Sequence, residues 1–170
     1  MAKRTDVFDI GRLGLSSGEG RSLDLEVPVD GFEFGGQRYD VEGGAVEARL
    51  DVSHTVHGYA FRLRFGTELD GPCVRCLEPA EQGVEVDARE IDQPGGDDQL
   101  SSPYFDAGHL DMHAWARDAL ALALPTKIVC REDCAGLCAV CGENLNRAPD
   151  HAHEREPDPR WAALRELKLD

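Results

Sequence analysis

The six cysteines of the chain occur at spacings that suit a metal site. Cys73-Val-Arg-Cys76 follows the Gly71-Pro72 turn, and two intervening residues allow both sulfurs to face one ion from a single tight loop. The remaining four come much later in the chain and are Cys130, Cys134, Cys138 and Cys141. Thiolates paired in this way are typical zinc ligands, so the sequence predicts structural zinc, with one or two ions.

Six thiolates exceed the four ligands that one tetrahedral zinc takes, so a second site or spare cysteines must follow. His151-Ala-His153 is close enough in sequence to contribute nitrogen ligands, although exposed histidines beside Asp150 and Glu154 are equally well explained as solvated surface residues. In the first partition, one site takes Cys73, Cys76, Cys130 and Cys134, and a second takes Cys138, Cys141, His151 and His153. In the second partition, Cys73 and Cys76 join Cys138 and Cys141 as in a zinc ribbon, which leaves Cys130 and Cys134 free or loosely metallated. Spacing is compatible with both.

Metal ligation is favoured over disulfides by the expected compartment. No stretch of the chain approaches the ~20 consecutive apolar residues of a membrane span, and the first residues lack the apolar core of a signal peptide. We therefore expect a cytoplasmic protein without membrane contact, in which thiols stay reduced.

The formal net charge of −15 restricts the choice of partner. A zinc site with four thiolates would add about −2 more, because the dication neutralises only half of the thiolate charge. An acidic surface repels phosphate backbones and suits a basic protein partner, although it could equally serve solubility alone.

Hydrophobic periodicity predicts an α+β fold. Apolar residues alternate with polar ones over 23–29, 46–52, 59–65 and 84–88, which is typical of half-buried strands connected as an antiparallel meander. An Ala- and Leu-rich run over 110–124 stops at Pro125 and predicts the main helix. We expect an antiparallel β-sheet or partial barrel with this helix packed on it and a Cys-rich, metal-binding C-terminal segment.

The same patterns divide the chain into three parts. Residues 1–20 mix charge with glycine and predict a flexible N-terminal arm with one short ordered piece. Residues 21–126 form the sheet and helix, with a flexible insertion over 93–103. Residues 127–170 form the Cys/His-rich segment, which we expect to end in a short amphipathic helix over 159–169 packed on the core.

Catalytic uses of these cysteines fit the sequence less well than a structural use. A dithiol oxidoreductase motif opens a helix, whereas Pro72 and Pro79 flank the first pair. A metal hydrolase needs an open coordination position and a base such as Glu132 or Asp133, whereas an all-cysteine site is closed. We therefore expect no enzyme and no small-molecule substrate, with a thiol redox protein or a rubredoxin-like iron protein as the alternatives.

Four segments resemble the YceD family of large ribosomal RNA subunit accumulation proteins. They are Cys73-Val-Arg-Cys76-Leu77, Leu122-Ala-Leu-Pro125, the stretch from Cys134 to Asn146 that contains Cys138 and Cys141, and Asp158-Pro-Arg160-Trp-Ala-Ala-Leu164. Many relatives carry Cys-x-Cys where this chain has His151-Ala-His153, and a histidine nitrogen can replace a thiolate on zinc.

The resemblance implies a role in the synthesis, processing or accumulation of large-subunit ribosomal RNA, without catalytic residues to transfer. We expect zinc to hold a surface that meets large ribosomal subunit components. The partner would be a basic ribosomal protein, or ribosomal RNA contacted locally by arginines at positions 62, 64, 75 and 131.

Overall fold

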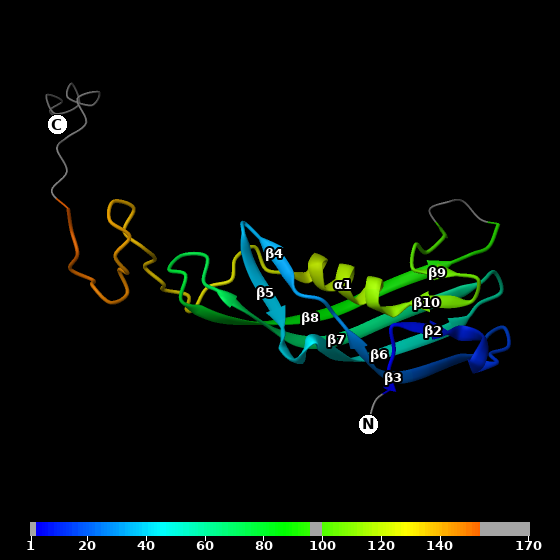
Figure 1. Cartoon of the computed structure of the whole chain (residues 1–170). Coiled ribbons are helices and arrows are strands. Elements are labelled where there is room, and N and C mark those ends of the chain that lie inside the picture. Colours follow the sequence, from blue (N-terminus) through cyan, green and yellow to red (C-terminus); the bar gives the residue numbers. More distant parts are fainter. Residues whose placement is uncertain (1–2, 96–99, 154–170) are drawn as a thin grey trace, which may run out of the picture.

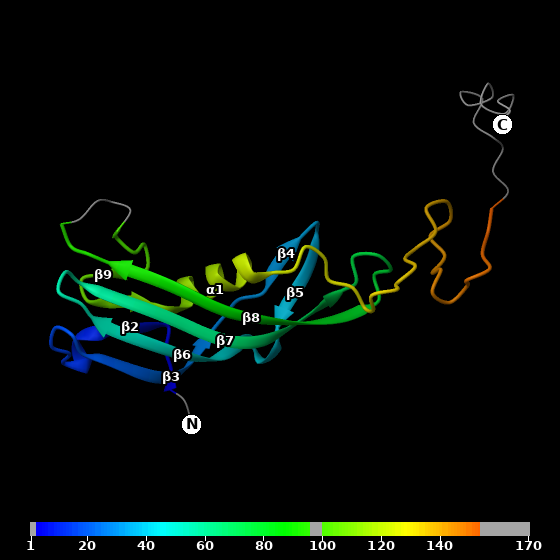
Figure 2. The ribbon, with the colours of Figure 1, turned by 180° about the vertical axis from the view of Figure 1, so that it is seen from behind.

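A computed structural model describes residues 3–95 and 100–153. Its main feature is an antiparallel meander with one helix lying along one face, as seen from both sides in Figures 1 and 2. The meander consists of β3 (Gly20–Pro28), β6 (Ala45–His54), β7 (Tyr59–Pro72) and β8 (Pro79–Asp92), and the helix is α1 (Met112–Ala123). The α+β class and the antiparallel sheet with one packed helix are thereby confirmed.

Strands β7 and β8 form a long hairpin that reaches beyond the rest of the sheet. They pair continuously from Tyr59↔Asp92 to Pro72↔Pro79, whereas β6 pairs only with the first part of β7, from His54↔Tyr59 to Arg49↔Arg64. The predicted strands ended near residues 65 and 88, but fully buried Leu69 continues the alternation past Gly66. The hairpin therefore presents its turn, with Cys73 and Cys76, at one end of the sheet (Figure 1).

Short strands complete the sheet and add a second one. The hairpin of β4 (Phe32–Phe34) and β5 (Gln37–Val41) pairs with the distal part of β7, and β1 (Lys3–Arg4) lies parallel to β3. A separate sheet has the order β2 (Val7–Asp9), β10 (His109–Asp111), β9 (Phe105–Asp106). The short 3-10 helices η1 (Ile10–Leu13) and η2 (Glu42–Gly44) connect strands.

Residues 3–20 hold more secondary structure than the one short ordered piece predicted for the N-terminal arm. They contain β1, β2 and η1, and Gly20 opens β3. The physical reason is that Ile10 is only 2% exposed and packs in the core, so this segment buries apolar surface. The predicted helix over 159–169 lies outside the described residues, and so does the middle of the 93–103 loop.

Helix α1 covers one face of the sheet (Figure 1), and its Trp115 and Leu120 are almost completely buried. The helix begins where the side chain of Asp111 accepts a hydrogen bond from the Ala114 N–H at 2.9 Å, and it ends before Pro125. Within the described ranges, no helix is long and apolar enough to cross a membrane.

Candidate metal centre

The β7–β8 turn is shaped so that both of its thiols point to the same side. The Cys73 N–H donates to the Glu78 carbonyl at 2.7 Å, and the Leu77 N–H donates to the Cys73 carbonyl at 2.9 Å. Leu77 adopts a left-handed backbone with φ 62°, which closes the turn. The Arg75 N–H lies 3.4 Å from the Cys73 sulfur, so the turn also directs a backbone donor at a thiolate.

The tail after α1 is held against this turn by backbone contacts. The Val74 N–H donates to the Ile128 carbonyl at 2.9 Å, and the Leu137 N–H donates to the Arg75 carbonyl at 3.1 Å. Arg75 also donates from Nη1 to the Cys134 carbonyl at 2.8 Å. These contacts bring Cys130 and Cys134 to the turn, although they follow it by more than fifty positions.

We call Cys73, Cys76, Cys130 and Cys134 the first cluster. Their four sulfurs lie within 4.8 Å of one another, with Cys73 to Cys134 at 3.8 Å and Cys76 to Cys130 at 3.6 Å. A tetrahedral zinc with bonds of about 2.3 Å places sulfurs about 3.8 Å apart, whereas a disulfide would place them about 2.05 Å apart. The donor set and its spacing therefore fit a closed tetrahedral metal site.

We call Cys138, Cys141, His151 and His153 the second cluster. The Cys141 sulfur lies 3.2 Å from the Nε2 atoms of both His151 and His153, and these two nitrogens are 2.9 Å apart. The Gly142 N–H donates to the Cys138 carbonyl at 2.8 Å, which forms the same kind of tight turn as in the hairpin. A tetrahedral zinc with two sulfur and two nitrogen ligands places its ligand atoms about 3.3 to 3.8 Å apart, as follows from the bond lengths. The distances in the second cluster are slightly shorter, so this donor set also fits zinc.

The pKa values of the cluster thiols are shifted by burial, by backbone N–H groups and by the neighbouring thiols. Burial opposes ionisation of Cys73, but backbone N–H groups, that of Arg75 among them, outweigh it and lower the pKa of Cys73 to about 6. Burial and the neighbouring thiols raise the pKa of Cys130 to about 12. In the second cluster, the backbone N–H groups of Cys141 and Val140 lower the pKa of Cys138 to about 6. Metal binding to the first cluster would release the protons that remain on its thiols.

Comparison with known proteins identifies the family. Residues 61–168, which include both clusters, match the family described as large ribosomal RNA subunit accumulation protein YceD. The chain belongs to the YceD family. An uncharacterized protein of Mycobacterium tuberculosis is 32% identical over 134 residues, covering 74% of this chain and 63% of the relative.

Two further relatives extend this comparison. An uncharacterized protein of Mycobacterium leprae is 30% identical over 168 residues, covering 95% of this chain and 76% of its own length. A Zea mays protein named "Large ribosomal RNA subunit accumulation protein YCED homolog 1, chloroplastic" is 30% identical over 173 residues, covering 79% of this chain and 58% of the maize protein. The chain thus spans under two thirds of the length of several relatives, and no solved structure is significantly similar to it.

The structure groups the predicted ligands of this YceD member as in the first of the two partitions. Cys73 and Cys76 meet Cys130 and Cys134, whereas the ribbon-like alternative required them to meet Cys138 and Cys141. His151, which is half-buried, and His153, which is exposed, both lie beside the second thiol pair. Metal binding by either cluster stays a prediction, as does the identity of the ion.

Asn146 is a site residue whose role was not predicted from the sequence. Its Nδ2 lies 3.4 Å from the Cys134 sulfur, and this contact is the largest cause of the lowered pKa of Cys134. Its Oδ1 accepts from the Ala135 N–H and from Arg131 Nη2, both at 2.8 Å. The Asn-Leu-Asn stretch was visible as part of the family motif, but only the fold shows that the second asparagine orients a thiolate.

Proposed function

We propose that this chain is a non-catalytic member of the YceD family that acts in large-subunit ribosomal RNA accumulation as a docking protein braced by two structural zinc ions. The observation that carries the proposal is the first cluster, in which two sulfurs of the β7–β8 turn and two of the tail lie within 4.8 Å of one another. Zinc held there by Cys73, Cys76, Cys130 and Cys134 would supply charge neutralisation and a rigid cross-link. The family description and the printed name of the maize relative both refer to the large ribosomal RNA subunit.

A structural role is supported by the composition of the ligand sets. Each cluster offers four protein ligands, which fills a tetrahedral zinc and leaves no position for substrate. Asp133, a candidate base for a hydrolase, is 85% exposed at its side chain and pairs with Arg131 at 3.2 Å. The thiol pair of the hairpin lies in a turn between two strands and not at the start of a helix, which disfavours dithiol redox chemistry.

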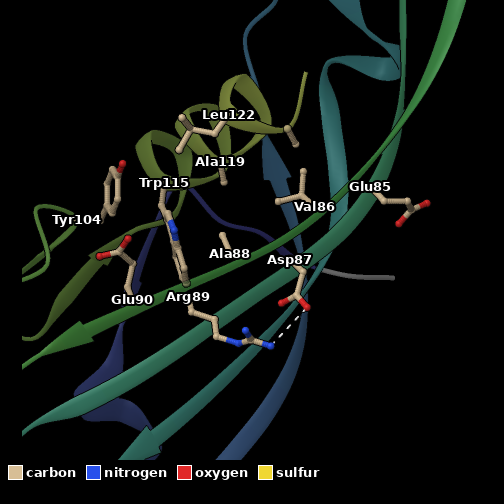
Figure 3. Close-up of a pocket in the computed structure, with 11 residues that line it drawn as sticks. Glu85, Val86, Asp87, Ala88, Arg89, Glu90, Tyr104, Trp115, Ala119 and Leu122 are labelled. Atoms are coloured by element: carbon tan, nitrogen blue, oxygen red, sulfur yellow. Dashed lines mark ion pairs between the residues drawn. The ribbon is translucent and has the colours of Figure 1, made fainter. Parts of the chain in front are cut away.

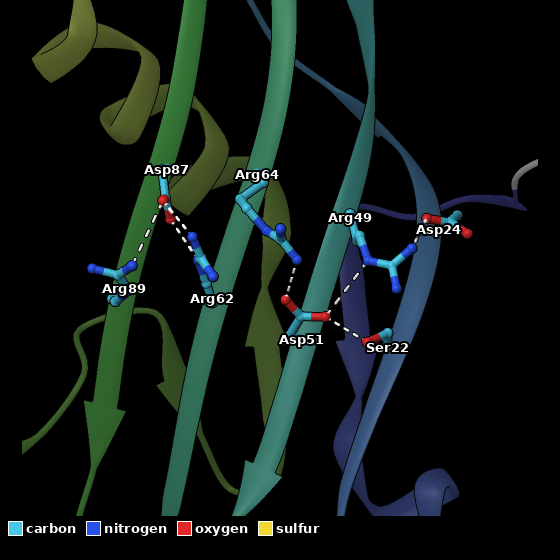
Figure 4. Close-up of polar contacts among 8 residues, drawn as sticks. All are labelled: Ser22, Asp24, Arg49, Asp51, Arg62, Arg64, Asp87 and Arg89. Atoms are coloured by element: carbon cyan, nitrogen blue, oxygen red, sulfur yellow. Dashed lines mark hydrogen bonds and ion pairs between the residues drawn. The ribbon is translucent and has the colours of Figure 1, made fainter.

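A protein partner is favoured over RNA by the pairing of arginines on the outer face of the sheet (Figure 4). Arg62 reaches Asp87 at 2.6 Å, and Arg64 reaches Asp51 at 2.5 Å, so both charges are compensated within the chain. Arg75 and Arg131, the other two arginines considered for RNA contact, are used to fix the tail. With a net charge of −15, the chain suits a basic ribosomal protein, and the proposal places it in the cytoplasm.

A pull-down of the tagged chain from cell lysate, with and without ribonuclease, tests this function. We expect large-subunit ribosomal proteins to be retained after ribonuclease treatment and to be lost with the Cys76→Ser/Cys130→Ser variant. The matched control is Val140→Ala, an exposed change in the tail outside both ligand sets. Recovery that depends entirely on RNA, or recovery of no large-subunit component, would contradict the proposal.

A further inference from the structure

Strand β8 has one free edge. Along the other edge it pairs with β7 over its whole length, from Pro79 to Asp92. Among residues 3–95 and 100–153, no strand pairs with the outer edge, although sheets usually shorten or cover such an edge. An edge of this length is a template for a further strand.

Hydrogen-bond alternation identifies the backbone groups that this edge presents. The Cys73 N–H to Glu78 carbonyl bond starts the β7–β8 ladder, and bonded pairs recur at every second residue. Even-numbered residues of β8 therefore bond to β7, whereas the N–H and C=O groups of Glu85, Asp87 and Arg89 point away from it. The β6–β7 ladder agrees with this assignment. Its bonded pairs begin with the Thr55 N–H to Gly58 carbonyl bond, so the even-numbered residues of β7 bond to β6 and the odd-numbered ones bond to β8.

An amphipathic groove of about 440 Å³ runs between this edge and α1. Its apolar wall includes Trp115, Ala119 and Leu122 from the helix, and Val86 and Ala88 lie along its strand side (Figure 3). Leu122 is 89% exposed, which is unusual for a leucine on a helix that otherwise packs against the sheet. A strand added to β8 would direct every second side chain into this groove.

The charges along β8 select for a basic ligand. The strand carries five carboxylates, at Glu81, Glu85, Asp87, Glu90 and Asp92, against one guanidinium, at Arg89. Glu81 and Glu85 are on the outer face and have no ion pair within the described residues, whereas Asp87 on the same face already pairs with Arg62 and Arg89. A lysine or arginine at every second position of an added strand would be attracted to these carboxylates. The phosphates of a nucleic acid on the same edge would be repelled by them.

We propose that the free edge of β8 binds an extended basic segment of a partner protein by strand addition. Apolar side chains of that segment would fill the groove beside Leu122, and a lysine or arginine between them would lie near Glu85. The inference rests on the proposed function only for the class of partner, a basic protein. The site itself rests on the open edge, the groove and the charge.

Binding of synthetic peptides to the full chain, measured by fluorescence anisotropy, tests this site. The probe is a labelled ten-residue peptide of alternating valine and lysine, and two derivatives carry N-methyl groups on one or the other alternate set of backbone amides. In strand addition only one set faces β8, so we expect one derivative to bind at least tenfold more weakly than the other. Equal affinities of the two derivatives, absence of binding, or tighter binding of a single-stranded oligonucleotide of equal length would overturn the proposal.

Variants of the protein locate the site. Leu122→Asp should weaken the peptide at least fivefold, whereas Val56→Asp, at a residue 83% exposed in the β6–β7 turn, should leave it unchanged. Thermal unfolding of both variants checks that they fold. Equal affinity of the two variants for the peptide would also contradict the proposed binding site. This assay contains no ribosomal component, so its failure would leave the result of the pull-down standing.

Discussion

The first cluster should stabilise the sheet, and the second should not. Cys73 and Cys76 are 0% and 4% exposed and belong to the same buried core as the strands, whereas the second cluster lies entirely in the tail. We expect chelation of zinc to lower the melting temperature of the sheet in the unmodified chain and in Cys141→Ser. In Cys73→Ser, chelation should have no further effect.

The size of this shift follows from mass action. At free zinc 1,000-fold above the dissociation constant, an ion that binds only the folded state stabilises it by about 4.1 kcal/mol. For a chain of 170 residues, each kcal/mol corresponds to roughly 2–4 °C, so chelation should lower the melting temperature by roughly 8–16 °C. Cys73→Ser should carry most of this loss before chelation, along with about 1–3 kcal/mol for a hydroxyl in a fully buried position.

The assay is thermal unfolding followed by circular dichroism in the β-sheet band, with and without a strong chelator. Cys141→Ser is the matched control, because it also removes one thiol ligand but from the tail cluster. The reasoning would be refuted if chelation left the unmodified chain unchanged. It would also be refuted if Cys141→Ser abolished the chelator effect as completely as Cys73→Ser.

Three further predictions concern other parts of the chain. His151→Ala combined with His153→Ala should reduce bound zinc from two ions to one per chain by elemental analysis, and two retained ions would remove these histidines from the ligand set. Gly71→Ala places a Cβ 2.2 Å from the ring of the buried tyrosine in β5 and should destabilise the chain by about 1–3 kcal/mol in urea unfolding, whereas Gly83→Ala, with nothing within 4 Å, should cost less than about 0.5 kcal/mol. Asp51 has a lowered folded pKa, because a serine hydroxyl and an arginine bind its carboxylate, so its stabilisation is present above the ordinary pKa of 3.8 and is lost as the pH falls through the folded value. Asp51→Asn should therefore destabilise the chain at neutral pH and have little effect in strong acid, and an equal effect at both pH values would refute that assignment.

The long strands and the helix could be predicted because each has a regular apolar period. In β6 and the first half of β7 the alternation is unbroken, and the helix ends at a proline. The β4–β5 hairpin was missed, although Gly35-Gly36 between Phe34 and Gln37 is a signal for a two-residue turn. Strands β9 and β10 were not predictable, because two or three residues are too few to show a period.

The ligand types could be predicted, but their grouping could not. Spacing alone allows Cys73 and Cys76 to meet either tail pair, since a flexible connection could bring either one to the hairpin turn. What decides is a set of backbone contacts with no sequence signature, such as Val74 to Ile128 and Leu137 to Arg75. The left-handed glycine Gly136, whose added Cβ would lie 3.1 Å from the Arg75 carbonyl, makes the close approach of the tail possible.

We propose above that the turn of the β7–β8 hairpin and the first thiol pair of the tail hold one ion. NMR of the chain loaded with an NMR-active cadmium isotope tests it directly, because scalar coupling connects each cysteine's β-protons to the cadmium that its sulfur binds. We predict one cadmium resonance coupled to Cys73, Cys76, Cys130 and Cys134, and a second coupled to Cys138 and Cys141. A single resonance coupling Cys73 and Cys76 to Cys138 and Cys141, or cadmium bound to the tail alone, would contradict the account.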